Sequence, residues 1–269
     1  MKTRKVIVIE ADIEGASLVD SIDMMTVTGE GYVFACDRLA HDLDAAILGC
    51  FDGGADEVRF EDGHGGGGNI KDVHRDPAAY PGIARAVQVS LNDPASLDGV
   101  SGYIQLNMHA MAGTANAFLD HTQSSAAWHN LWLNGRRSGE IAQGAYLAGA
   151  RGIPYIMMTG DRAACDEARD FVPDAVCVEV KHANERNRAV CIDGDEAGRL
   201  IREAARLAVS TLESRRPLIL PLPVTLTVEF NRSDYCDNTM RGRPGLVRLD
   251  ARTVTRTVTE IRGYGDMMP

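Results

Sequence analysis

The chain has 269 residues, which is enough for one large domain or two smaller ones with a buried core. Its formal net charge of −10 disfavours nucleic acid and anionic membranes as partners, because both require clustered cations on the protein. No apolar run reaches the roughly 18 residues of a membrane-spanning helix, and the N-terminal stretch lacks the long apolar segment of a signal peptide. These features predict a cytoplasmic protein.

Short apolar runs that end in polar residues predict a series of β-strands. They lie at residues 5–12, 57–62, 102–109, 154–161 and 175–180. Helical patterns of apolar residues alternate with them, at residues 31–54, 139–152, 161–172 and 195–214. This alternation predicts an α/β fold with a mainly parallel sheet flanked by helices.

The pattern changes near residue 216. Three prolines within residues 215–223 end the last helix, and residues 224–230 alternate as a half-buried strand does. Residues 243–265 are consistent with a further strand and a closing helix. We therefore expect an α/β core over residues 1–215 and a smaller C-terminal α+β subdomain, residues 216–269, packed on it.

Polar side chains follow three of the predicted strands at the point where each strand ends. Asp12 and Glu14 come after the first strand, Asp62 and His64 after the second, and His109 after the third. In parallel α/β sheets, ligands bind outside the carboxyl ends of the strands. This shared placement favours a functional site at that edge of the sheet.

Four consecutive glycines, Gly65–Gly68, directly follow His64 and allow three interpretations. A phosphate-binding loop would need a G-x-x-x-x-G-K-[ST] or G-x-G-x-x-G arrangement that opens a helix, and neither is present. An esterase would need a serine within G-x-S-x-G, and Ser17, Ser101 and Ser138 all lack that context. The third interpretation is a metal site that includes His64.

Several residue types at the strand ends suit a metal site. Asp12 and Glu14 stand two residues apart, so their side chains can point the same way in extended backbone. Two neighbouring carboxylates repel each other unless a cation or a proton compensates them. His109 ends a largely apolar run, and a buried imidazole needs a partner. Carboxylate and imidazole ligands together indicate zinc or manganese.

Five spaced motifs in the same order also occur in one protein family. They are "ADIEG", "EDGH", "NMHAMAGT", "FLDH" and "LNGRRSGEIAQGAYLAGARGIPYIMMTGD". With these motifs the chain resembles the zinc-dependent D-aminopeptidases of the DppA type, over residues 6–206. The glycine run and the segment from residue 217 onward depart from the family pattern.

The resemblance implies a site with two zinc ions per subunit, for which manganese could substitute. Its implied metal ligands are Asp12, which would bridge both ions, Glu14, His64, His109 and Glu140. His121, in "FLDH", matches the family's catalytic histidine. We further predict that the substrate contacts Asp62, Gly65, Asn116 and Arg186.

The expected function is therefore that of a metal-dependent aminopeptidase that hydrolyses the N-terminal residue of short peptides. The resemblance implies D-amino-acid or β-amino-acid peptides as substrates and a ring-shaped homo-oligomer, such as a decamer, as the assembly. The alternative is a non-catalytic α/β protein that binds a phosphorylated small ligand through Gly65–Gly68.

Overall fold

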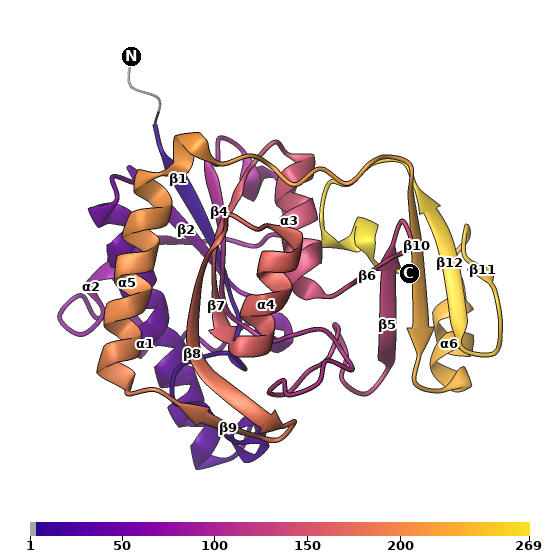
Figure 1. The fold of residues 1–269 in the computed structure, drawn as a ribbon, viewed down its shortest axis with the longest axis horizontal. Helices are drawn as coiled ribbons and strands as arrows, with labels where there is room; N and C mark the ends of the chain where they lie inside the picture. Colours follow the sequence, from indigo (N-terminus) through magenta and orange to yellow (C-terminus); the bar gives the residue numbers. More distant parts are fainter. Residues whose placement is uncertain (1–3) are drawn as a thin grey trace.

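The computed structural model describes residues 4–269, and its central element is a seven-stranded sheet, here sheet A (Figure 1). In spatial order its strands are β3 (Val87–Gln88), β2 (Glu57–Asp62), β1 (Val6–Ala11), β4 (Gly102–Met108), β7 (Tyr155–Asp161), β8 (Val176–Glu185) and β9 (Arg188–Cys191). All neighbours pair in parallel except β9, which is antiparallel to β8. Strands β4 and β7 are buried along their whole length, as apolar strands inside a parallel sheet are. The five predicted strands and the parallel sheet are confirmed.

Helices cover both faces of sheet A. One face packs on α1 (Glu30–Asp52) and α5 (Gly194–Ser210), which lie side by side in Figure 1. The other face packs on α3 (Glu140–Ala150) and α4 (Arg162–Phe171). The short helix α2 (Pro81–Arg85) contacts α1. These four longer helices confirm the predicted helical segments and the α/β class.

A second sheet, sheet B, is antiparallel. Helices α3 and α4 lie between sheet B and the side of the molecule that carries α1 and α5 (Figure 1). In spatial order its strands are β11 (Val247–Arg248), β12 (Thr253–Val258), β10 (Val224–Phe230), β5 (Trp128–Leu133) and β6 (Arg136–Ser138). Helix α6 (Ser233–Met240) follows β10. Leu131 and Leu226 of sheet B share one buried apolar cluster with Val8 of sheet A, so the two sheets are joined by a common core.

Sheet B differs from the prediction in two places. The predicted closing helix is wrong, because residues 253–258 form β12 and only a short 3₁₀ helix follows; threonine and valine dominate this stretch and favour a strand. Strands β5 and β6 were not predicted, although Asn134-Gly135 between them, with φ of 50° and 79°, is a common two-residue hairpin turn. These strands precede residue 215, so sheet B contains strands from both sides of the predicted domain boundary at 215/216. That boundary stays a prediction.

Short 3₁₀ helices complete the fold. They are η1 (Ile22–Met25), η2 (His64–Gly66), η3 (Asp72–Arg75), η4 (Pro94–Leu97), η5 (Leu212–Ser214) and η6 (Tyr264–Met267). Within residues 4–269, no helix combines the length and the apolar character that crossing a membrane requires.

Candidate metal centre

Six acidic and histidine side chains meet at the carboxyl edge of sheet A. Strands β2, β1 and β4 are neighbours in this sheet, so the segments that follow them emerge side by side. Asp12 and Glu14 follow β1, His64 follows β2 and His109 follows β4. His121 comes from the loop between β4 and β5, and Glu140 is the first residue of α3. The structure therefore brings together every metal ligand predicted from the sequence.

Asp12, Glu14 and His64 form a first group, the β1–β2 trio. The His64 Nδ1 atom lies 3.0 Å from Asp12 Oδ1 and 2.9 Å from Glu14 Oε2. Burial alone would lower the pKa of His64, but its hydrogen bonds to Asp12 and Glu14 raise it to about 12. Burial opposes ionisation of Asp12 as well, yet the hydrogen bond and charge of His64 hold the pKa of Asp12 below its usual range. Without metal, the protonated His64 therefore forms ion pairs with both Asp12 and Glu14.

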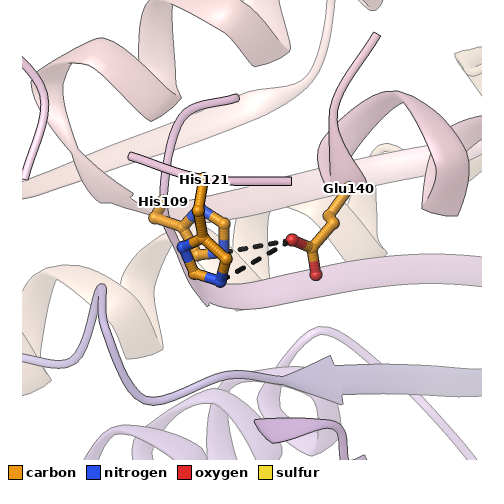
Figure 2. A group of neighbouring side chains, drawn as sticks. All are labelled: His109, His121 and Glu140. Atoms are coloured by element: carbon orange, nitrogen blue, oxygen red, sulfur yellow. Dashed lines mark ion pairs between the residues drawn. The ribbon is translucent and has the colours of Figure 1, made fainter. Parts of the chain in front are cut away.

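His109, His121 and Glu140 form a second group, the β4–α3 trio, shown in Figure 2. Glu140 Oε1 lies 3.5 Å from His109 Nε2 and 3.9 Å from His121 Nε2. The two imidazole rings stack with centroids 3.8 Å apart and planes at 14°. No contact in this trio is as short as those of the β1–β2 trio.

Backbone carbonyls orient both histidines of the β4–α3 trio. His109 Nδ1 lies 3.1 Å from Ala110 O, and His121 Nδ1 lies 2.8 Å from Leu119 O. Each Nδ1–H therefore donates to a carbonyl, which leaves the lone pair on each Nε2. Metal-ligating histidines are commonly held in this way.

The Nε2 atom of His109 is the least satisfied polar atom of the site. It is buried and has no hydrogen-bond partner within residues 4–269. Asp12 Oδ2 and Glu140 Oε1 both lie 3.5 Å away, so a lone pair faces two carboxylate groups. Burial and the nearby charge of His121 lower the pKa of His109, which disfavours relief by protonation. A cation between these three groups would satisfy all of them, and carboxylate with imidazole is a ligand set that suits zinc.

Glu140 and His121, the other two members of the β4–α3 trio, each shift the pKa of the other. Burial raises the pKa of Glu140, and the charge of His121 partly opposes that rise. Burial would lower the pKa of His121, but the negative charges of Glu140 and Glu14 raise it. The pKa of His121 therefore lies above its ordinary value, and this imidazole holds its proton more firmly than burial alone would allow.

One cavity of about 470 Å³ gives access to both trios. Asp12 and Glu14 line it from one trio, and His121 and Glu140 line it from the other. Gln123 also lines this cavity, and its backbone N–H donates to Glu140 Oε1 at 2.6 Å. The sequence carries no local signal for this role of Gln123, because Glu140 is 17 residues away.

The glycine run forms part of the cavity wall. Gly65, Gly66, Gly67 and Gly68 all have positive φ, between 59° and 94°, a region that residues with a Cβ rarely occupy. Gly65 and Gly66 line the cavity, and a Cβ added to either would meet no atom within 4 Å. The run is followed by residues 69–71 and the four-residue helix η3. The glycines thus provide a sharp turn beside His64 and open space, without the longer helix of a phosphate loop.

The predicted substrate contacts lie in different surroundings. Gly65 lines the cavity, whereas the Asp62 carboxylate accepts hydrogen bonds from the Asn69 backbone, the Asn69 side chain and the Ile70 backbone. Asp62 therefore shapes the glycine turn. Arg186 lines an adjoining cavity of about 430 Å³ and pairs with Asp120, with Nε to Oδ1 at 3.2 Å.

Asn116 lies in the loop between β4 and β5 and is exposed. Its φ of 57° is in the left-handed region, which asparagine tolerates better than most residues. Asn116 is not among the residues that line the two cavities at the trios and Arg186. The four substrate contacts stay predictions.

Comparison with known proteins links this fold and site to one family. The family model for D-aminopeptidases matches residues 5–268. A D-aminopeptidase of Bacillus subtilis (strain 168) is 26% identical over 196 residues, which are 71% of this chain and 69% of the relative. Among solved structures, the Zn-dependent D-aminopeptidase DppA from Bacillus subtilis, a self-compartmentalizing protease, superposes with a TM-score of 0.86 at 24% identity. That superposition covers 97% of this chain and 95% of the other, so the fold is shared through sheet B and beyond the motifs of residues 6–206.

Proposed function

The chain belongs to the D-aminopeptidase family and is a metallo-aminopeptidase, and from this premise we propose that it releases the N-terminal residue of short peptides with the help of two zinc ions. One ion would be held by the β1–β2 trio and the other by His109 and Glu140. The observation that carries this proposal is the buried Nε2 of His109, which faces Asp12 and Glu140 at 3.5 Å without a hydrogen bond.

In this proposal Asp12 would serve both metal sites. Its Oδ1 atom faces His64 Nδ1 at 3.0 Å, and its Oδ2 atom faces His109 Nε2 at 3.5 Å. The two oxygens of one carboxylate thus point to different trios. Zinc at such a site would supply Lewis acidity for the peptide carbonyl and lower the pKa of a water molecule.

His121 is the proposed proton carrier. It lines the cavity, and its Nδ1–H is occupied by Leu119 O, so Nε2 is the atom that can exchange a proton with substrate. The charge of Glu140 keeps this imidazole protonated more readily than burial alone would allow. A histidine in this position can deliver the proton that the departing amine needs.

Substrate preference follows from the family and from the cavity. We propose substrates with a free amino terminus and a D-amino-acid or β-amino-acid residue first, because the matching family model is that of D-aminopeptidases and Asp12, Glu14 and Glu140 border a cavity that would hold the metal beside the substrate. Arg186 in the adjoining cavity would meet the carboxylate end of a short peptide. Family membership contradicts the non-catalytic alternative.

The proposed assembly is a ring-shaped homo-oligomer in the cytoplasm, such as a decamer. Its support is the self-compartmentalizing character of the Bacillus subtilis structure with the same fold. Light scattering of the purified protein would give the mass of the assembly, and a monomer would contradict this part of the proposal.

The test of the proposed function combines metal content with a substrate panel. We expect about two zinc equivalents per chain, and cleavage of free-amino dipeptides with D- or β-residues by zinc- or manganese-loaded protein. The same dipeptides with an acetylated amino terminus serve as the control and should resist cleavage. His109→Ala should lose zinc and activity together. A stable wild-type protein that binds no zinc would overturn the proposal.

A further inference from the structure

A buried lysine lies behind the β1–β2 trio. Lys181 in β8 is 0% exposed, and its Nζ donates hydrogen bonds to Glu14 O at 2.8 Å and Val19 O at 2.6 Å. The same atom lies 5.0 Å from the centre of the Phe118 ring. Lys181 forms no ion pair with a carboxylate within residues 4–269. A buried cation without a paired anion is costly, so its retention calls for a reason outside simple packing.

The two carbonyls that Lys181 binds are the ends of one turn. Glu14 and Val19 are separated by five positions, and the turn between them begins two residues after Asp12. This turn also docks on the end of β4, where the Gly15 N–H donates to Asn107 O at 2.7 Å. A Cβ at Gly15 would lie 2.3 Å from that backbone, so the contact admits only glycine. The main chain at Glu14 is thus held from two sides.

We propose that Lys181 is a positioning residue for the metal site, which fixes the backbone of Glu14 and so directs the Asp12 and Glu14 carboxylates toward the metal. This inference rests on the proposed function. The ammonium group also places a positive charge behind a segment that carries two neighbouring carboxylates. An apolar residue of similar length would fill the space but leave the carbonyls of Glu14 and Val19 without this donor.

Asp42 provides a matched control, because it holds the same turn at another point. This fully buried residue of α1 accepts hydrogen bonds from Ser17 N at 2.7 Å and Ser17 Oγ at 2.6 Å. It makes no hydrogen bond to Glu14 within the described chain. Asp42→Asn should therefore loosen the turn and lower stability without moving the Glu14 carboxylate.

The experiment compares Lys181→Met, Lys181→Arg and Asp42→Asn with the wild type. Zinc affinity is measured by competition with a chromogenic chelator, together with kcat, KM and the thermal midpoint. For Lys181→Met we expect zinc affinity to fall roughly 10–100-fold, the range for residues that orient metal ligands, and kcat to fall more than KM changes. Lys181→Arg should recover part of the affinity. Asp42→Asn should lose thermal stability and keep wild-type zinc affinity.

The outcomes separate this inference from the proposed function. Wild-type zinc affinity in Lys181→Met, or an equal loss in Asp42→Asn, would overturn the positioning role while the metal site stands. A wild-type protein that binds no zinc would overturn both. If Lys181→Met does not fold, Lys181→Gln replaces it; because this variant keeps a hydrogen-bond donor, we expect a smaller loss of zinc affinity, and wild-type zinc affinity would again overturn the positioning role.

Discussion

Both trios combine carboxylates with histidines, but the β1–β2 trio has two carboxylates and one histidine, the β4–α3 trio has one carboxylate and two histidines, and their contacts differ. In the β1–β2 trio, His64 contacts both carboxylates at 3.0 Å or less, whereas in the β4–α3 trio no histidine comes closer than 3.5 Å to Glu140. The His64 side chain is 19% exposed and is flanked by glycines, so its ring can turn toward its partners. The His109 side chain is 1% exposed and is fixed by Ala110 O and the His121 ring.

This difference indicates how each half responds when metal is absent. The β1–β2 trio offsets one of its two negative charges by keeping a proton on His64, and zinc has to displace that proton. In the β4–α3 trio both histidines stay 3.5 Å or more from Glu140, so a cation is the simplest way to satisfy His109. The groups behind the trios differ as well, since Lys181 lies behind the first and the buried acid Glu167 lies behind the second.

The largest expected effect on turnover comes from His121→Ala. Loss of a general acid typically lowers kcat by roughly 10²–10⁴-fold, and zinc content should stay at the wild-type value. The matched control is His182→Ala, because His182 is a histidine of β8 that belongs to neither trio and lines neither of the two cavities. Steady-state kinetics and elemental analysis decide the outcome. Loss of zinc along with activity would make His121 a ligand instead of a proton carrier.

The second prediction contrasts the trios directly in metal-free protein. His64→Ala should lower the free energy of unfolding by about 3 kcal/mol, because Asp12 and Glu14 then lack their partner. His109→Ala should cost less, since it removes an unsatisfied buried atom along with its packing. Urea unfolding in the presence of a chelator measures both. Equal losses in the two variants would contradict the comparison.

The glycine turn should show a smaller effect. Gly66 has φ of 94°, so Gly66→Ala is expected to lower the free energy of unfolding by about 1–2 kcal/mol through backbone strain. The control is Gly265→Ala, where an added Cβ meets no atom within 4 Å and φ is outside the left-handed region. Urea unfolding of both variants tests the strain. Wild-type stability in Gly66→Ala would show that the turn can adopt another conformation.

Glu167→Gln should have the least effect on turnover but a clear effect on the pH dependence of stability. Burial raises the pKa of Glu167 from 4.5 to about 8, against a hydrogen bond from the Met111 N–H at 2.7 Å. Between these pH values the folded protein keeps a proton that the unfolded chain loses, so rising pH favours unfolding through this group. The variant should therefore lose less stability than the wild type between pH 5 and pH 8, by roughly 1 kcal/mol or more, since one pKa unit corresponds to about 1.4 kcal/mol. Parallel curves of unfolding free energy against pH would refute this role of Glu167.

The sequence by itself determined most of sheet A and the identity of the candidate ligands. Apolar runs such as residues 102–109 are local signals, and polar residues after them must emerge at one edge of a parallel sheet. For that reason Asp12, His64 and His109 could be placed together before their contacts were known. The Asn134-Gly135 turn was an equally local signal for the β5–β6 hairpin, although the prediction omitted it.

Only the tertiary structure decided the groups that act across long separations. Strand β5 pairs with β10 almost a hundred positions later, and Lys181 reaches the carbonyl of Glu14 from 167 positions away. The unpaired Nε2 of His109 likewise depends on how three segments pack. Periodicity in a sequence reports which side of an element is buried, whereas hydrogen-bond partners of buried groups depend on where other elements lie. The ligands could therefore be predicted from the sequence, but the contrast between the two trios could not.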